Sequence, residues 1–382
     1  MNDNNDNDII IIGGGLAGLY LCYELSKQTS NITLYEKNDF FGGKILSQQY
    51  NDIFIDFGPT QAKDTDTNLK NLCQELEIPI KEFDIQHLNV DYENIKKKLY
   101  NIYKTNKDKI INLNFETFCQ IYVEPKDIRF LHDNFLFDYI WIYDTHYIFN
   151  SSILDDVGPR CGKYFTIDNK KSWQYLIDKL IDKCLEKKVI LNSNVECIEI
   201  IPDEHAIIIN RSGDIHKDFY KKLYLACDSS IKNLKGLPYQ FNDILKNLLD
   251  IPLLTLYLSS KENNTLPVTS TIFGCLSKID NYLISSRTDS DKANFLINLL
   301  QNNSENLLKI LENYGITNID KIFFMYWENG LNIYSENMNF NIKTNKYNMT
   351  LYSNDICLLG NYVSMKQGTM EGSIESVNNY LT

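Results

Sequence analysis

The sequence is poor in arginine and has no excess of positive charge. Four of its 382 residues are arginines, and 38 Lys and Arg stand against 50 Asp and Glu, for a formal net charge of −12. A protein that binds a nucleic-acid backbone needs the opposite balance or a dense basic stripe, so the sequence excludes that class. The acidic balance is typical of a solubilising surface; steering of cationic substrates is the alternative interpretation.

Long apolar runs are also missing. One of the two longest stretches without charge covers residues 9–23 and contains four glycines. It is too short and too interrupted to cross a membrane as a helix. The first eight residues are acidic and polar, so they predict no secretory signal.

The sequence also lacks C-x-x-C pairs and histidines at the spacing of metal ligands. The nine cysteines are scattered without a C-x-x-C pair, which is typical of reduced thiols in the cytoplasm. The five histidines lack metal-ligand spacing, so we expect no metal site. Lysine far outnumbers arginine, and Asn and Ile are frequent, as in an AT-rich genome such as that of a large DNA virus. A viral origin would place the protein in the host cytoplasm or the virion.

The remaining composition is that of an ordinary globular protein. Apolar residues make up 43% and charged residues 23% of the chain, so the chain is expected to fold. At roughly 150 residues per domain, its length predicts about two domains.

The most informative segment lies near the start of the chain. Residues 9–12 are four isoleucines, which predict a short buried strand. They are followed by Gly13-x-Gly15-x-x-Gly18, the spacing of a dinucleotide-binding turn. In such a turn the first glycine permits a tight bend, the second lets a pyrophosphate approach the backbone, and the third lets the helix pack on the strand. A glycine-rich turn in an ordinary α/β core is the alternative.

The residues around this turn complete a β-α-β unit. A helix is predicted to begin at Leu16 and Ala17, where its free N–H groups and positive dipole end face the phosphates. A second strand over residues 32–35 ends at Glu36, 18 positions beyond Gly18. An acid at this distance binds both hydroxyls of an adenosine ribose.

Helix and strand patterns continue along the rest of the chain. Residues 83–165 are helical and aromatic-rich, as expected of an inserted domain. Other helices are expected over residues 65–77, 172–185, 304–314 and 368–380. Strands are expected over residues 195–201, 206–210, 215–220, 223–226, 253–258, 269–273, 282–286, 322–327 and 356–359.

The residues after the second strand make a family resemblance specific. Glu36 and Lys37 are followed by Gly42, Gly43 and Lys44. This segment resembles the E-x5-G-G-R/K signature of the flavin-containing amine oxidase superfamily, which includes monoamine and polyamine oxidases, phytoene desaturases and protoporphyrinogen oxidases. The resemblance implies FAD as the cofactor, with the glycine pair close to its phosphates and Lys44 nearby.

Three further blocks resemble the same superfamily in the same order. Residues 55–60 are similar to the strand and turn beside the flavin, and residues 193–198 to the strand whose valine backbone contacts adenine. Residues 357–376 are similar to the closing motif, whose helix points its N-terminus at the pyrimidine oxygen of the flavin. The cofactor contacts that these blocks imply are Gly58, Pro59, Thr60, Val195, Gly360, Asn361, Gly368, Thr369 and Met370.

Three features depart from relatives in the superfamily. The acid that usually follows the glycine of the closing motif is Asn361, which can hydrogen-bond a ribityl hydroxyl without charge. The lysine that holds a water against flavin N5 has no counterpart in residues 253–258, and Lys261 lies beyond their end. No cysteine lies between Trp327 and Ile356, where some relatives tether the flavin, so we expect non-covalent FAD.

Aromatic residues are the candidates for substrate contacts. Trp327, Tyr334 and Tyr362 could form an aromatic wall that orients an amine by stacking or cation–π contacts. Because aromatic residues make up 12% of the chain, core packing is the alternative. No catalytic side chain is identified, since hydride transfer from a neutral amine needs no obligatory acid or base.

The resemblance implies an α/β fold, a two-domain FAD-dependent oxidoreductase with a Rossmann-like FAD domain and a smaller α+β substrate domain. We expect the FAD domain over residues 1–83, 165–236 and 349–382 and the substrate domain over residues 84–164 and 237–348. The predicted function is oxidation of a primary or secondary amine, with polyamines among the candidates, by hydride transfer to flavin N5 with oxygen as acceptor. An FAD-dependent desaturase or protoporphyrinogen-oxidase-like enzyme and a catalytically silent FAD-binding module stay open.

Overall fold

The computed structural model divides into two compact units. Unit 1 combines Met1–Phe83, Lys163–Leu248 and Asn348–Thr382, and unit 2 combines Asp84–Gly162 and Leu249–Tyr347. The structure describes residues 7–86, 90–135, 137–151, 153–157, 161–168, 171–261, 275–278, 283–334, 340–341, 346–347, 351–353 and 355–381. Assignment of FAD binding and substrate binding to the two units stays a prediction.

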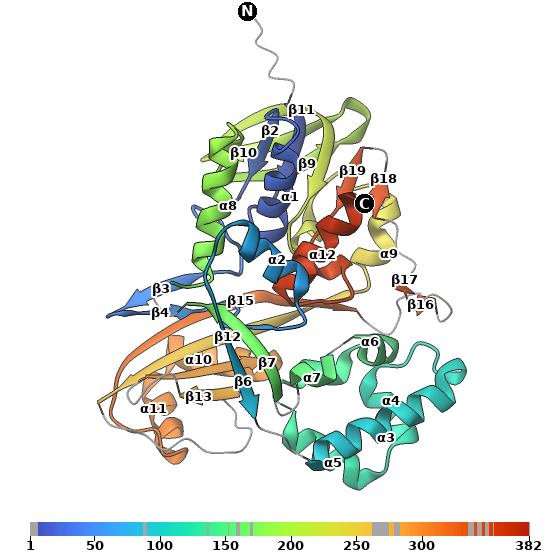
Figure 1. Cartoon of the computed structure of the whole chain (residues 1–382), viewed down its shortest axis with the longest axis vertical. Coiled ribbons are helices and arrows are strands. Elements are labelled where there is room, and N and C mark those ends of the chain that lie inside the picture. Colours follow the sequence, from blue (N-terminus) through green and yellow to red (C-terminus); the bar gives the residue numbers. More distant parts are fainter. Residues whose placement is uncertain are drawn as a thin grey trace, which may run out of the picture. The chain divides into compact units, whose positions relative to one another are not determined.

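Unit 1 is built on a mostly parallel sheet (Figure 1). Its order is β18 (Tyr352–Ser353), β19 (Ile356–Leu358), β11 (Asp214–Leu225), β1 (Asn7–Ile12), β2 (Ile32–Tyr35) and β8 (Ile190–Asn192). The five strands from β19 to β8 are parallel, and β18 is antiparallel to β19. The antiparallel strands β9 (Val195–Ile201) and β10 (Ala206–Arg211) continue the sheet along the first half of β11. Parallel strands bring their carboxyl ends to one edge, where ligands bind in such folds.

Four helices pack with this sheet. They are α1 (Leu16–Ser26), α2 (Thr67–Glu75), α8 (Gln174–Glu186) and α12 (Met370–Leu381). Helix α1 contacts α8 and α12, and α12 contacts α2 (Figure 1). Their shared core includes Leu19, Leu34, Leu180 and Ile374, all without exposed surface. Burial of such side chains contributes about 2 kcal/mol each, which fixes the helices on the sheet.

Several short elements complete unit 1. The strands β3 (Ser47–Tyr50) and β4 (Ile53–Asp56) form a hairpin, and α9 covers Asn242–Leu245. A second, three-stranded sheet has the order β5 (Ala62–Lys63), β7 (Cys161–Ile167) and β6 (Ile80–Gln86). The strands β6 and β7 carry the chain into and out of unit 2.

Unit 2 contains an antiparallel sheet and a helical segment. The sheet has the order β13 (Cys275–Lys278), β14 (Leu283–Asp289), β12 (Leu248–Ser260) and β15 (Ile319–Tyr334). Helices α10 (Ser290–Asn302) and α11 (Ser304–Asn313) share an apolar core with its strands. The helical segment consists of α3 (Val90–Asn106), α4 (Phe115–Tyr122), α5 (Pro125–Asn134), α6 (Thr145–Asn150) and α7 (Ile153–Val157). A short pair, β16 (Phe340–Asn341) and β17 (Lys346–Tyr347), follows β15.

The structure differs from the sequence-based expectation at several elements. The segment expected to be helical over residues 83–165 includes the end of β6 and most of β7, which are strands, and β3, β5, β8 and β13 were not expected. The strands expected over residues 215–220 and 223–226 are one strand, β11, because Lys221 and Lys222 are exposed and do not interrupt it. Helix α10 was not expected, although Ala293 and its neighbours show apolar helical spacing. The strand expected over residues 269–273 lies outside the described residues. In the part of the chain that is described, no helix is long and apolar enough to cross a membrane.

Candidate functional site

Three glycines shape the turn between β1 and α1. Gly13 has a φ of 107°, and a Cβ there would lie 2.7 Å from the carbonyl oxygen of Ala226. A Cβ on Gly18 would lie 2.0 Å from the carbonyl oxygen of Gly13. Gly15 has an ordinary φ of −75°, and within 4 Å a Cβ there would meet, among the described residues, only the Cα of Gly43, at 3.9 Å. The fold therefore requires Gly13 and Gly18, whereas Gly15 leaves open space beside the backbone.

The N-terminus of α1 opens onto this space. Gly15 occupies the N-cap position and brings no capping side chain, and the first turn holds no acidic residue. The first-turn amides, which include those of Leu16 and Ala17, have no partner within the helix itself. Together with the helix dipole, they make this end of α1 suited to an anionic group.

Glu36 connects the glycine turn to the neighbouring strands. It directly follows β2 and is only 5% exposed. Its Oε2 accepts a hydrogen bond from the Gly14 N–H at 2.7 Å, and its Oε1 accepts from the backbone and side-chain amides of Asn38 at 2.9 and 2.8 Å. The N–H of Val195 donates to the Glu36 carbonyl at 2.9 Å. The structure therefore brings the predicted ribose-binding and adenine-contacting residues together.

The second glycine pair lies against the first glycine turn. The Gly42 N–H donates to the Gly14 carbonyl at 2.8 Å, and Gly42 forms a parallel bridge with Gly15. The φ angles of Gly42 and Gly43 are 115° and 60°, a region that favours glycine. The two glycine-rich segments, about 25 positions apart, thus form one backbone surface.

Residues 58–60 lie beside the loop that carries Lys44. A Cβ on Gly58 would lie 1.8 Å from the Lys44 carbonyl oxygen, so only glycine fits there. Pro59 follows, and the Thr60 carbonyl accepts a hydrogen bond from the Thr166 hydroxyl at 3.0 Å. Contact of these residues with a cofactor stays a prediction.

Asp228 belongs to the same surface and was missed by the sequence analysis. Burial acts to raise its pKa, but hydrogen bonds from Ser230 and the charges of Lys44 and Lys37 outweigh burial and hold the pKa below its usual value. The Asp228 carboxylate is therefore ionised at neutral pH. Its position two residues after the strand expected over residues 223–226 was the available signal, because ligands bind at the carboxyl ends of parallel strands.

The closing motif forms the turn between β19 and α12. Gly360 has a φ of 128° and Gly368 a φ of 72°, so both need glycine. Asn361 follows the first turn and is partly exposed. Thr369 caps α12, because its hydroxyl accepts the N–H three residues later at 2.9 Å, and Met370 is the first helical residue. Whether this helix end faces a flavin stays a prediction.

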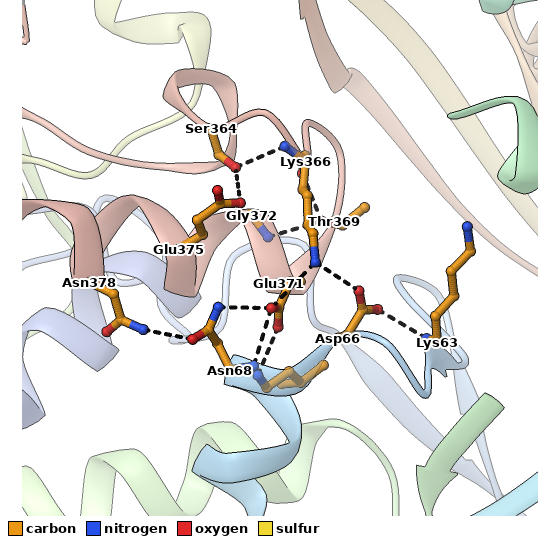
Figure 2. Close-up of polar contacts among 11 residues, drawn as sticks. Lys63, Asp66, Asn68, Ser364, Lys366, Thr369, Glu371, Gly372, Glu375 and Asn378 are labelled. Atoms are coloured by element: carbon orange, nitrogen blue, oxygen red, sulfur yellow. Dashed lines mark hydrogen bonds and ion pairs between the residues drawn. The ribbon is translucent and has the colours of Figure 1, made fainter. Parts of the chain in front are cut away.

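Glu371 joins the N-termini of α12 and α2, as Figure 2 shows. It is 1% exposed, and its carboxylate accepts the Asn68 N–H at 3.2 Å, the Asn68 side-chain amide at 2.8 Å and the Leu69 N–H at 2.8 Å. The Lys366 ammonium lies 3.4 Å from Glu371 and 3.5 Å from Asp66. One buried carboxylate therefore accepts hydrogen bonds from two first-turn amides of α2 and connects α2 with α12. Glu371 lies within the predicted closing motif, residues 357–376, but no role was expected for it.

The three predicted substrate contacts are distributed over both units. Trp327 lies on β15 of unit 2, and its Nε1 has no hydrogen-bond partner within the described ranges. Tyr334 ends the same strand, and its side chain lies outside the described residues. Tyr362 belongs to unit 1, is 1% exposed, and its hydroxyl lacks a hydrogen-bond partner in the described part of the chain. The aromatic wall stays a prediction.

Lys261 lies at the surface of unit 2. It directly follows β12, its side chain is 74% exposed, and its ammonium pairs with Asp320 at 3.2 Å. The strand β12 itself contains no lysine. Neither β12 nor Lys261 offers a buried ammonium group.

His146 is a buried histidine whose two ring nitrogens both have hydrogen-bond partners. Its Nδ1 lies 2.9 Å from the Tyr103 hydroxyl and its Nε2 lies 2.8 Å from the Ile110 carbonyl, so Nε2 donates and Nδ1 accepts. Burial lowers the pKa of His146. Among the described residues, no group of three or more His, Cys, Asp or Glu side chains could hold a metal ion.

Comparisons with known proteins agree with this geometry. Residues 11–76 match a family described as an NAD(P)-binding Rossmann-like domain. The chain is 33% identical over 117 residues to the probable flavin-containing monoamine oxidase A of Dictyostelium discoideum, covering 30% of this chain and 25% of that protein. It is 34% identical over 89 residues to the 1-hydroxycarotenoid 3,4-desaturase of Flavobacterium sp., covering 23% of this chain and 16% of that protein.

A solved structure extends the likeness to nearly the whole chain. A variant of putrescine oxidase with redesigned cofactor binding superposes with a TM-score of 0.74 at 10% identity, covering 98% of this chain and 97% of that chain. The sequence matches, in contrast, span a quarter or less of the two curated relatives. The fold is mixed α/β with a Rossmann-like domain, which confirms the predicted fold class. The predicted resemblance to the flavin-containing amine oxidase superfamily is confirmed as well.

Proposed function

We propose that the protein is an FAD-dependent oxidoreductase that oxidises a primary or secondary amine. The observation that carries this proposal is the open backbone surface at Gly15 and Gly43, which faces the uncapped end of α1. Glu36 lies beside it at the end of β2. The amine oxidase and putrescine oxidase relatives support an amine as the substrate, with polyamines among the candidates.

The residues of unit 1 suit each part of FAD. The space beside Gly15 and the amides of Leu16 and Ala17 would receive the pyrophosphate. Glu36 already accepts three hydrogen bonds, and a carboxylate has about four acceptor sites, so it would accept one ribose hydroxyl rather than two. The backbone of Val195 would contact adenine.

The flavin end of the site would involve the remaining predicted residues. Lys44 would supply positive charge near the phosphates, and Asn361 would hydrogen-bond the ribityl chain. The N-terminus of α12, capped by Thr369, would stabilise negative charge on the reduced ring. When bound, FAD supplies at N5 an acceptor for a hydride from the amine α-carbon, leaving an imine that water hydrolyses, while oxygen regenerates the oxidised flavin and forms hydrogen peroxide.

The chain's part in this reaction would be binding, orientation and exclusion of water. Trp327 and Tyr334 are the candidates that would orient the amine. The burial of Tyr362 argues against a ring that faces the substrate. Seven cysteines in the described ranges are free thiols, which supports a cytoplasmic location.

Desaturation of a C–C bond is the second candidate function. The carotenoid desaturase relative favours it. The exposed position of Lys261 removes one argument for amine oxidation. A catalytically silent FAD-binding module would share the cofactor site. These alternatives predict a bound flavin that amines do not reduce, and a desaturase acting on a lipid-like substrate would also co-sediment with liposomes.

Oxygen uptake and peroxide formation test the proposed activity. The FAD-loaded protein is mixed with pools of polyamines, monoamines and amino acids, with free FAD at equal concentration as the control. We expect one pool to drive oxygen uptake with equal peroxide release. Flavin-loaded protein that shows neither with any pool would refute amine oxidation with oxygen as acceptor.

A further inference from the structure

The ends of β11 and β19 carry a carboxylate and an amide at equivalent positions. The two strands are parallel neighbours in the sheet of unit 1, and Leu225 pairs with Leu358. Asp228 lies three residues after Leu225, and Asn361 lies three residues after Leu358. In a parallel ladder, equal offsets from a pair lie side by side at the same edge of the sheet.

The backbones stay close beyond the last ladder pair. A Cβ on Gly360 would lie 3.7 Å from the carbonyl oxygen of Cys227, and a Cβ on Gly13 would lie 3.0 Å from the Cys227 nitrogen. The Cys227 thiol donates to the Ile12 carbonyl at 3.2 Å. The end of β11 therefore lies between the Gly13 turn and the Gly360 turn, and Asp228 is the next residue after Cys227.

Asp228 retains capacity to bind a ligand. Within the described part of the chain, its hydrogen bonds come from Ser230, whose N–H donates to Oδ1 at 3.0 Å. A carboxylate offers about four acceptor sites, so several are left. Although burial acts to raise the pKa of Asp228, the Ser230 hydrogen bonds and the charges of Lys44 and Lys37 hold it below its usual value, and the side chain is partly exposed.

We infer that Asp228 is a cofactor-binding residue whose carboxylate accepts a hydrogen bond from a hydroxyl of the bound dinucleotide beside Asn361. This inference rests on the proposed binding of FAD. A charged acceptor forms a stronger hydrogen bond with a hydroxyl than an amide oxygen does. Asp228 thus provides the negative charge that position 361 lacks, from the adjacent strand.

A charge swap tests this assignment. The FAD dissociation constants of the apoprotein and of the D228N, N361D and D228N/N361D variants are measured by quenching of flavin fluorescence near neutral pH. We expect D228N to weaken FAD binding about tenfold, because a charge-assisted hydrogen bond is lost. We expect N361D to weaken binding as well, since it sets a second carboxylate beside Asp228. The double variant moves the single charge to the neighbouring strand and should bind within about threefold of the wild type.

Controls separate binding from folding. Asparagine caps helical turns as well as aspartate does, so D228N should keep the thermal unfolding temperature of the apoprotein. Asp355 lies at the opposite end of β19 and pairs with Lys222, so D355N should leave FAD affinity unchanged. The N361D variant leaves Asp228 in place, so it tests independently of D228N whether positions 228 and 361 are adjacent.

The outcomes distinguish this inference from the proposed function. Wild-type protein that does not take up FAD overturns both. Wild-type protein that binds FAD, with D228N binding equally well, overturns the role of Asp228 alone. A double variant that binds FAD no better than D228N contradicts the inference that the side chains at positions 228 and 361 lie side by side at the cofactor.

Discussion

The carboxylate of Glu371 in the first turn of α12 accepts hydrogen bonds from both the backbone and the side-chain amide of Asn68 in the first turn of α2 (Figure 2). The two residues are 303 positions apart in the chain. Two helix N-termini thus share one buried negative charge. Because α12 is the helix that would face the flavin, this contact connects the stability of unit 1 to the geometry of the proposed site.

The first prediction concerns Glu371. A Glu371→Gln substitution turns one acceptor oxygen into a donor that faces the amides of Asn68 and Leu69, so a buried donor loses its partner. We expect the free energy of unfolding to fall by about 2 kcal/mol in urea denaturation. Among the described residues, Glu375 accepts a hydrogen bond only from the Ser364 hydroxyl, and it is partly exposed, so Glu375→Gln is the matched control. Equal losses in both variants would contradict a special role for Glu371.

The second prediction separates two glycines of one turn. Ala at position 18 would place its Cβ 2.0 Å from the Gly13 carbonyl oxygen, so Gly18→Ala should destabilise the fold. We expect a loss of about 3 kcal/mol or more. Ala at position 15 fits the unliganded protein but occupies the space beside Gly43, so Gly15→Ala should keep its stability and weaken FAD binding at least about tenfold. Thermal unfolding and FAD titration check the pair, and normal FAD affinity in Gly15→Ala would show that the cofactor does not approach there.

The third prediction concerns pH. Burial lowers the pKa of His146 in the folded state, so its contribution to stability is complete above the unfolded pKa and is lost as the pH falls. The urea midpoint should drop between about pH 7.5 and about pH 5.5, and His146→Gln should show a smaller drop. His205 is exposed, so His205→Gln should retain the full drop. An unchanged pH dependence in His146→Gln would show that other groups cause it.

The fourth prediction concerns attachment of the flavin. No cysteine lies between Trp327 and Ile356, so the cofactor should not be tethered by a thioether. After acid precipitation of the loaded protein, all of the yellow colour should stay in the supernatant. Colour that remains in the washed pellet would mean a covalent link to another residue.

The local parts of the candidate site could be predicted from the sequence. The turn from Gly13 to Gly18 and the strand that ends at Glu36 lie within one β-α-β unit, where glycine spacing and apolar pattern determine the geometry. The sequence-based prediction divided β11 into two strands, because two consecutive lysines resemble a break between strands. In the structure both lysines are exposed and the strand continues through them.

Contacts between distant segments could not be predicted in the same way. Asp228 acquires its position from the pairing of β11 with β19, which follows the topology of the sheet rather than any local motif. Glu371 was visible within a motif, but its partner Asn68 is set by the packing of α12 on α2. Long-range pairing of this kind needs the folded chain.

An anaerobic visible absorption spectrum tests the central claim most directly. The purified protein, loaded with FAD, is recorded before and after addition of a pool of polyamines, monoamines and amino acids. The account predicts a flavin band that bleaches, because the amine reduces the bound flavin without oxygen. A flavin band that persists after this addition would contradict amine oxidation. A colourless protein that cannot take up added FAD would contradict the cofactor assignment itself.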